Sequence, residues 1–310
     1  MKKQTRRTFL GTGVGLAGLS SSCSSEREEK ADDKNWIDSH VHVWTSDRES
    51  YPLSPNFSER EVKPPTFLPD ELFAHQEGTG VHRTVLVQMS FYEFDNSYML
   101  HVMEKYPGRF GGIGIVNDKE TGVGEKMKEL AASGVRGFRL YAFPDRVKDW
   151  ESSEGIQAMW KTGGENGLAM CCLTDPAALP VVDKMVKAYP DTPVVIDHFA
   201  RIGMRGSVDQ GELDQLLALA EFPNTHLKVS AYYALGKKAP PYTDLAPMFR
   251  QVRDAFGAER LMWGSDCPYQ VQGDHSYGAS LALVTEGLDF LSAEEKEHIL
   301  RKTADTLFFS

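Results

Sequence analysis

The sequence predicts an α/β fold, a single-domain (β/α)8 TIM barrel in which eight parallel strands alternate with helices. The chain has 310 residues, enough for one large α/β domain. Short, continuous apolar runs follow one another from residue 36 onward, as expected for strands buried on both faces. Segments with helical periodicity separate these runs, which implies parallel strands joined by right-handed crossovers. A doubly wound open sheet is the alternative, but no GxGxxG motif follows an early strand to favour it.

The predicted strands are eight apolar runs, at residues 36–44, 84–88, 112–116, 137–140, 168–172, 194–198, 226–230 and 261–265. Their number and the length of the chain beyond residue 35 match the usual size of a (β/α)8 barrel. No second change in composition interrupts residues 36–310, so they are predicted to form one domain. The segment 45–69, rich in proline and serine, is predicted to be a loop over the barrel mouth.

Helical periodicity is clearest in six segments, at residues 125–132, 176–189, 213–222, 245–256, 279–291 and 293–308. The first of them ends just before Gly134, and glycine is favoured immediately past a helix C-terminus. Ser292 is the predicted N-cap of the last helix, and Glu295 three residues later completes a capping box. These helices would supply the outer layer of the barrel.

The N-terminal 25 residues predict an export signal of the twin-arginine type. Arg6 and Arg7 precede a glycine-rich apolar run over residues 9–19, which is too short to span a bilayer as a stable helix. Cys23 follows three serines in a stretch that weakly resembles a lipoprotein cleavage box, so lipidation is left open. Residues 26–35 are polar and charge-rich and predict a disordered tether. The expected location is the periplasm, with a lipid anchor on Cys23 as an open alternative.

The amino-acid composition limits the kinds of molecule that this protein is expected to bind. The formal net charge is −10 and the chain has no basic stripe, which argues against nucleic acid and anionic membrane surfaces. Membrane contact is expected only through the export signal or a lipid on Cys23. The four cysteines include no CxxC motif, so neither a zinc ribbon nor a disulfide scaffold is predicted. A small molecule is the expected partner.

Two histidines spaced i, i+2 lie in the first predicted strand. Side chains alternate across a strand, so His40 and His42 project to the same face. Two imidazoles converging from one strand can bind a metal ion or flank a substrate carbonyl. An isolated HxH pair is more often one core histidine and one surface histidine, so the other strand ends decide between these interpretations.

Polar side chains recur at the ends of the later strands. In (β/α)8 barrels the active site lies at the carboxyl ends of the strands. The side chains expected there are Gln88, Arg139, Tyr141, Cys171, Cys172, His198, Ser230 and Asp266. Ionisable groups occur regularly at these positions. The sequence therefore favours an active site at the mouth of the barrel over polar residues that are scattered at random and serve only the structure.

Four stretches, residues 37–44, 195–198, 224–230 and 263–268, resemble the amidohydrolase superfamily. The resemblance is to its amidohydrolase-related branch (amidohydrolase 2), which includes sugar-acid and dicarboxylate lactonases. It extends over nearly all of the chain after the tether, and it implies a (β/α)8 barrel. It also implies that His40, His42, His198 and Asp266 form the catalytic core, with Asp266 as the general base on the attacking water.

The residue types agree with these roles. A carboxylate beside imidazoles, as Asp266 would be, can take a proton from water and return it to a leaving oxygen. The other catalytic candidates are His198 and Arg139, and Asp197 is expected to face away from them. Both Arg139 and Arg201 suit a substrate carboxylate or a developing oxyanion, although structural salt bridges would use them equally well. Arg201 is therefore a candidate for substrate binding, and the further candidates are Gln88, Tyr141 and Trp44.

The metal requirement has two open alternatives. Relatives with binuclear zinc use a carboxylated lysine on the fourth strand and a histidine on the fifth, whereas this chain offers Arg139 and then Cys171-Cys172. A binuclear centre is therefore not expected. One Zn²⁺ or Mn²⁺ ion could be held by residues of the catalytic core, namely His40, His42, His198 and Asp266. The alternative is a metal-free site in which cationic side chains polarise the carbonyl.

The predicted function is hydrolysis of a small lactone of the sugar-acid or dicarboxylate type. Water would be activated by Asp266, which would then protonate the departing alkoxide. A metal-dependent amidohydrolase and a non-oxidative decarboxylase of the same superfamily are the alternatives. Decarboxylase relatives typically add a histidine on the fifth strand, which is missing here. The alternative from another class is a non-catalytic periplasmic barrel that binds a ligand.

Overall fold

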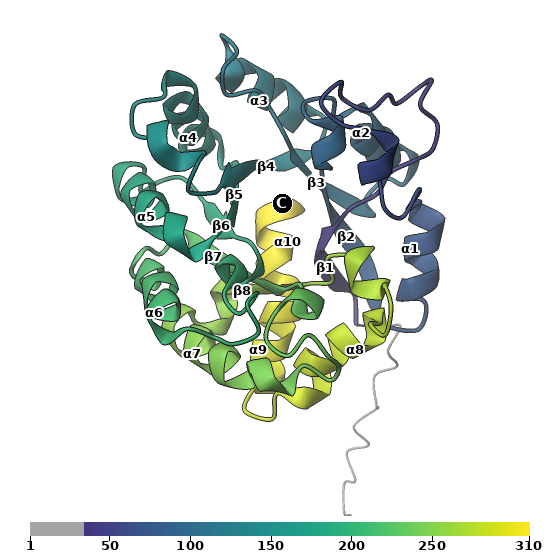
Figure 1. Cartoon of the computed structure of the whole chain (residues 1–310), viewed down its shortest axis with the longest axis vertical. Helices are drawn as coiled ribbons and strands as arrows, with labels where there is room; N and C mark the ends of the chain where they lie inside the picture. Colours follow the sequence, from purple (N-terminus) through teal and green to yellow (C-terminus); the bar gives the residue numbers. More distant parts are fainter. Residues whose placement is uncertain (1–33) are drawn as a thin grey trace, which may run out of the picture.

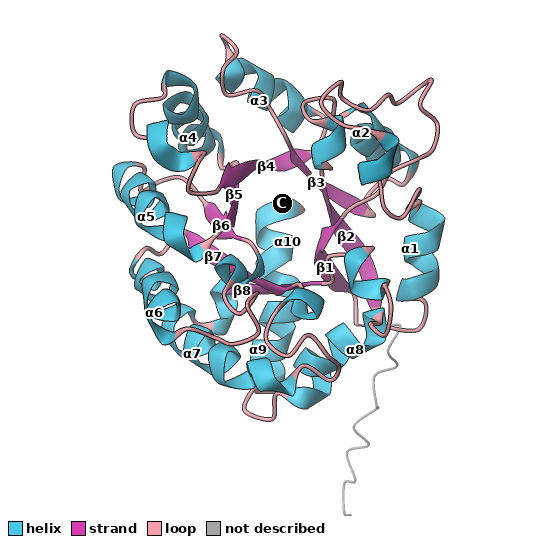
Figure 2. Cartoon of the chain, viewed as in Figure 1, coloured by secondary structure: helices cyan, strands magenta, loops and turns pink. Residues whose placement is uncertain are grey.

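The computed structural model describes residues 34–310. The predicted export signal with Cys23, and residues 26–33 of the predicted tether, lie outside the described residues. The strands form a ring enclosed by helices (Figures 1 and 2). They are β1 Trp36–Val41, β2 Val81–Val87, β3 Phe110–Gly114, β4 Val135–Ala142, β5 Ala169–Thr174, β6 Val194–Ile196, β7 Thr225–Ser230 and β8 Leu261–Gly264.

The sheet contains eight strands in the order of the sequence, and each strand pairs in parallel with the next. A doubly wound sheet reverses direction along its strand order, whereas this order is sequential throughout, so the barrel prediction is confirmed. The seam between β1 and β8 is nearly closed by a parallel bridge from Val41 to Cys267. Across the same seam, the backbone N–H of Asp266 donates to His40 O at 2.8 Å, and that of His42 donates to Cys267 O at 2.9 Å.

Ten α-helices lie among the described residues. They are α1 Pro69–Gln76, α2 Ser97–Lys105, α3 Val123–Ala132, α4 Glu154–Asn166, α5 Leu179–Ala188, α6 Gln210–Ala218, α7 Ala246–Phe256, α8 Tyr277–Ala282, α9 Ala293–Glu297 and α10 Thr303–Phe308. The predicted capping box is present, because Ser292 Oγ accepts from the N–H of Glu295 while Glu295 Oε2 accepts from the N–H of Ser292. None of the helices in residues 34–310 combines the length and the apolar character that a membrane span requires.

The sequence pattern did not reveal α1, α2 and α4. In α4, Gly163 and Gly164 lower the helix propensity and interrupt the apolar spacing. Gly163 allows close packing, because a Cβ there would lie 2.8 Å from the backbone oxygen of Leu168. The predicted helices 279–291 and 293–308 also differ in detail, since each contains a π-helical turn, Leu283–Gly287 and His298–Lys302.

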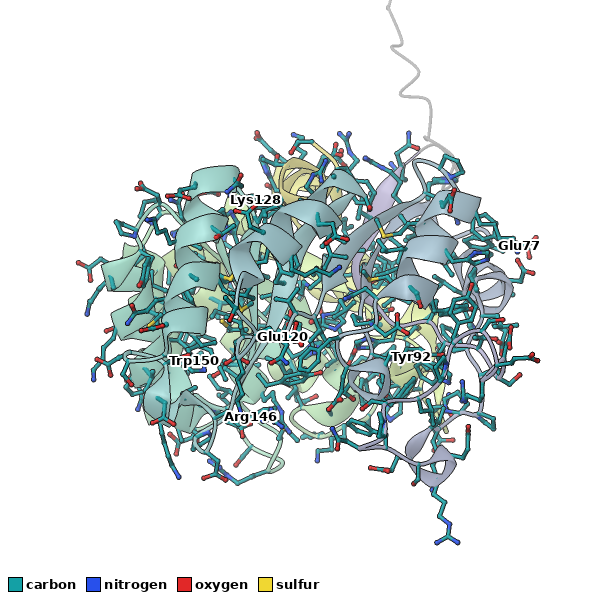
Figure 3. The ribbon with its side chains drawn as sticks, turned by 90° about the horizontal axis from the view of Figure 1, so that it is seen from above. Glu77, Tyr92, Glu120, Lys128, Arg146 and Trp150 are labelled. Carbon is teal, nitrogen blue, oxygen red and sulfur yellow. The ribbon has the colours of Figure 1, made fainter. Side chains whose placement is uncertain are left out.

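The barrel interior is filled from below by α10, which lies at the centre of the ring in Figure 1. Ala304 and Phe308 of this helix pack into the interior core, whose other members are Ile37, Val85, Val87, Ile113, Ala169, Cys171, Val195 and Met262. Asp305 pairs with Arg83 near the start of β2 at 2.6 Å, which places α10 at the amino-terminal end of the strands. In the side view of Figure 3, Arg146, in the segment after β4, lies toward the opposite end of the barrel from Lys128 on α3.

Candidate active site

A cavity of about 280 Å³ opens at the carboxyl ends of the strands. Seven of the predicted site residues line it: His42, Gln88, Arg139, Tyr141, His198, Arg201 and Asp266. His40 is fully buried and contacts His42 and His198 through ring–ring contacts, with centroids 5.0 and 4.4 Å away. The structure therefore brings the predicted catalytic core together in one mouth.

Asp266 lies two residues beyond the end of β8, in a left-handed backbone conformation with φ of 64°. This turn, together with its hydrogen bond to the backbone of β1, directs the carboxylate into the mouth. Its Oδ1 lies 3.3 Å from Nε2 of His42 and 3.6 Å from Nε2 of His40. Its Oδ2 lies 3.9 Å from Nε2 of His198 and accepts a hydrogen bond from the hydroxyl of Tyr233 at 2.7 Å.

Neighbouring groups orient each imidazole. Nδ1 of His42 is 2.8 Å from the carbonyl oxygen of Val87, which can only accept, so this nitrogen carries a proton and Nε2 faces Asp266. Nε2 of His40 is 3.0 Å from Nη2 of Arg139, and a guanidinium can only donate, so this nitrogen accepts.

In His198, Nδ1 is 2.7 Å from the hydroxyl of Ser230 on β7. The other ring nitrogen, Nε2, is left to face Asp266. The reactive face of the site is thus built from nitrogens whose orientation the surrounding protein fixes.

A buried charge cluster lies beneath the histidines. Asp197 is fully buried, with Oδ1 3.2 Å from Nζ of Lys228 and 3.4 Å from Nδ1 of His40, and Oδ2 3.2 Å from Nη2 of Arg139. Burial alone would raise the pKa of Asp197, but the charges of Lys228 and Arg139, and the contact with His40, hold it well below its usual range. One carboxylate therefore balances two cations inside the barrel.

The expectation that Asp197 faces away from the site was wrong. β6 ends at Ile196, and Asp197 continues its alternation, so it points into the barrel like Val195. His198 also enters the mouth, because the four residues from His198 to Arg201 adopt left-handed backbone conformations with φ between 50° and 60°. Such a run is rare for residues other than glycine, and it turns the chain sharply after the strand.

Burial opposes the protonation of two of the imidazoles, His40 and His198. It lowers the pKa of His40 well below its usual value, and the nearby charge of Lys228 lowers it further. Burial is also the main reason why the pKa of His198 is lowered. For Asp266 burial alone would raise the pKa, but the neighbouring histidines His198, His42 and His40 together hold it well below the usual range. The site therefore places the carboxylate of Asp266 beside His40 and His198, whose protonation burial opposes.

The upper wall of the cavity is aromatic and carries a second arginine. Arg201 is half-buried, and its Nη1 pairs with Oδ1 of Asp175 at 2.7 Å. Tyr141, Phe143, Tyr233 and Tyr269 line the remaining wall, and Gln88 donates through Nε2 to the backbone oxygen of Asp95 at 2.5 Å. Burial raises the pKa of Tyr269 to about 12, so its hydroxyl keeps its proton.

Trp44 does not line this cavity. It is fully buried, its Nε1 donates to the backbone oxygen of Pro64 at 2.9 Å, and its ring packs against Phe67, Phe91 and Tyr269. The geometry therefore gives Trp44 a structural position behind the wall, in place of the predicted contact with substrate.

Sequence reasoning missed two neighbours of the catalytic core. Lys228 shares a strand face with Ser230, but nothing in the sequence indicated its pairing with Asp197, which follows the neighbouring strand β6. Tyr233 lies three residues past the end of β7 in a short turn, where no periodic pattern indicates the direction of a side chain. Only the folded chain brings it to Asp266.

The site residues fit a single divalent metal ion. His40, His198 and Asp266 each offer a ligand atom, and these atoms lie within 4.8 Å of one another. Two imidazole nitrogens and a carboxylate oxygen form a donor set that suits Zn²⁺. Oδ1 of Asp266 is buried and has no hydrogen-bond partner within residues 34–310. On His40 such an ion would compete with Arg139 for Nε2.

Comparison with known proteins finds several relatives of this chain. L-fucono-1,5-lactonase of Burkholderia ambifaria is 29% identical over 270 residues, which cover 85% of this chain and 91% of the relative. The structure of a Pseudomonas putida protein, described as a candidate 2-pyrone-4,6-dicarboxylic acid hydrolase, superposes with a TM-score of 0.74 at 28% identity, covering 89% of this chain and 97% of the other.

A Burkholderia multivorans amidohydrolase, solved with bound zinc, shares the fold with a TM-score of 0.73 at 22% identity, over 88% of this chain and 99% of that one. Residues 37–309 match the model of the amidohydrolase family. This match extends from the first strand to the end of α10, so it includes all the residues of the candidate site. The chain therefore belongs to the amidohydrolase family.

Proposed function

We propose that this protein hydrolyses a small lactone, with Asp266 as the general base. The single observation that carries the proposal is the carboxylate of Asp266, whose Oδ1 lacks a hydrogen-bond partner within residues 34–310 and is flanked by His42 and His40 at the mouth of the cavity. The named relatives support the substrate class, because L-fucono-1,5-lactonase acts on a cyclic ester and so does a 2-pyrone-4,6-dicarboxylic acid hydrolase.

In the proposed reaction, Asp266 Oδ1 takes a proton from water while the water oxygen attacks the lactone carbonyl carbon. The tetrahedral intermediate carries a negative oxygen, which the Arg139 guanidinium is placed to stabilise. The ring C–O bond then breaks, and the proton held by Asp266 passes to the departing alkoxide. The product is the open hydroxy acid, and the carboxylate of Asp266 is restored.

The walls of the cavity suit a sugar-acid or dicarboxylate lactone. Arg201, on the wall of the cavity, would offer a guanidinium to a carboxylate or hydroxyl group of the substrate. The aromatic side chains of Tyr141 and Tyr269 offer flat apolar surfaces for the ring itself. Gln88 completes the polar contacts at the edge of the cavity.

The proposal also includes one bound divalent metal ion. His40, His198 and Asp266 would hold one Zn²⁺ or Mn²⁺ ion, with His42 beside them. When bound, such an ion polarises a carbonyl or lowers the pKa of a bound water. Metal analysis of protein purified without chelators tests this part. About one equivalent of metal per chain, together with loss of activity on chelation, supports the metal site, whereas full activity without metal assigns the polarisation to Arg139.

Asp266→Asn tests the proposed function. Purified protein is incubated with a panel of aldonolactones and dicarboxylate lactones, and proton release is followed. We expect the wild type to turn over at least one lactone and Asp266→Asn to lower kcat by about 10²- to 10⁴-fold, the usual contribution of general acid–base catalysis. Asp183→Asn, on the outer surface of α5, is the matched control and should retain wild-type turnover. Turnover of no lactone by the wild type, or normal turnover by Asp266→Asn, contradicts the proposal.

We further propose that residues 1–25 direct export to the periplasm and are followed by a tether. Support comes from the Arg6-Arg7 pair and the short apolar run after it. Cell fractionation of wild type and an Arg6→Lys, Arg7→Lys double variant tests this part. Wild type in the periplasmic fraction and the variant retained in the cytoplasm support it, and an identical distribution contradicts it. Membrane association that depends on Cys23 would indicate lipidation.

A further inference from the structure

Tyr233 is the one tyrosine for which the structure gives a hydrogen bond to the carboxylate of Asp266, among residues 34–310. Its hydroxyl donates to Oδ2 at 2.7 Å, and both residues line the cavity. Its ring packs against Tyr269 and His275, with centroid distances of 6.4 and 6.1 Å, and these contacts help to fix its position. The hydrogen bond between Tyr233 and Asp266 therefore belongs to the active-site cavity.

The two oxygens of Asp266 have different surroundings. Oδ2 is held by Tyr233, whereas Oδ1 is buried and has no hydrogen-bond partner within the part of the chain that the structure describes. Oδ1 is also the oxygen that lies nearer to His42 and His40, at 3.3 and 3.6 Å. We propose that Tyr233 is a positioning residue that anchors Oδ2 and thereby leaves Oδ1 as the oxygen that takes the proton from water.

The proposal rests on the proposed function, and it adds which oxygen reacts and what holds it there. A carboxylate on a short side chain can rotate about χ2, which exchanges its two oxygens. A fixed donor on one oxygen removes this freedom and keeps the other aimed at the water. Burial and the charge of Asp266 both raise the pKa of Tyr233 far above its usual value, so the phenol keeps its proton and remains a donor.

Tyr233→Phe is the test, because it removes the hydroxyl and keeps the ring that packs between its neighbours. A hydrogen bond to a charged group typically corresponds to a factor of about ten or more, so we expect kcat to fall about tenfold with KM changed less than about twofold.

Tyr232→Phe is the matched control. It makes the same chemical change at the adjacent residue, whose hydroxyl donates to the backbone oxygen of Val229 and does not reach Asp266. Its kcat and its KM should equal those of the wild type. If Tyr233 acts only through the carboxylate, adding Tyr233→Phe to Asp266→Asn should change the residual rate less than about twofold.

The outcomes separate this inference from the proposed function. If Asp266→Asn is inactive while Tyr233→Phe matches Tyr232→Phe in kcat and in KM, the positioning role is overturned and the hydrolase stands. Normal activity of Asp266→Asn overturns both. A raised KM with unchanged kcat in Tyr233→Phe would make Tyr233 a substrate contact and would also overturn the positioning role.

Discussion

Replacing Lys228 by methionine should destabilise the protein, and the loss should depend on pH. The ammonium is fully buried, 3.2 Å from Oδ1 of Asp197 and 3.3 Å from Nδ1 of His40. Removing one member of a buried ion pair costs about 3–5 kcal/mol. Because Arg139 still pairs with the other oxygen of Asp197, we expect the lower end, a loss of about 3 kcal/mol at pH 8.

The sign of the pH dependence follows from His40. Its pKa is lowered first by burial and next by Lys228, so the folded wild type resists protonation of this imidazole and loses stability as the pH falls through the unfolded value. Without Lys228 the imidazole can take up a proton and pair with Asp197. The difference in unfolding free energy between wild type and Lys228→Met should therefore shrink between pH 8 and pH 5.5.

Urea denaturation at the two pH values measures this difference. Lys187→Met is the matched control, since this lysine forms an exposed pair with Asp183 on α5, and its unfolding midpoint should match that of the wild type. A loss below about 1 kcal/mol at pH 8 would refute the argument that the cluster depends on Lys228. A loss that grows toward pH 5.5 would refute the account of His40.

Two further predictions concern groups outside the reacting centre. Burial raises the pKa of Asp38 to about 6, so its contribution to stability is greatest below pH 3.8 and is lost as the pH rises through 6. Between pH 4 and 7, urea denaturation should show the wild type losing about 2 kcal/mol relative to Asp38→Asn, and a constant difference would contradict this. Trp44→Phe should lower the unfolding free energy by about 2 kcal/mol, through the lost bond to Pro64 and looser packing, with KM unchanged. A tenfold rise in KM would restore Trp44 to substrate binding.

The barrel could be predicted because its signals are local and repeated. Each strand is an apolar run, and the alternation of runs with helical segments specifies the parallel order. The predicted site followed from the rule that barrel chemistry lies at strand ends, which places His42, Arg139, His198 and Asp266 in one mouth, where the structure also has them. Periodicity failed for α4, where glycines required by close packing interrupt it.

The rest of the site depends on departures from regular structure. Strand alternation places Asp197 inside the barrel and would send His198 outward, and only the left-handed turn after β6 brings both into the site. Trp44 lies just past β1, where the strand has already ended, so the alternation that placed His40 and His42 no longer applied. The pairing of Lys228 with Asp197 is a tertiary contact between neighbouring strands, and one sequence gives no register for it.

The position of α10 has a consequence for the order in which the molecule is completed. This helix follows every strand in the chain, yet Phe308 lies 5.6 Å below the ammonium of Lys228 and seals the lower end of the barrel. Until it docks, water can reach the paired charges from underneath, and the low dielectric that sets the proton affinities of the histidines is absent. A newly formed barrel with all eight strands in place would therefore still lack the proton affinities of the finished active site. A fusion that displaces α10 would likewise impair the chemistry at the opposite end of the barrel.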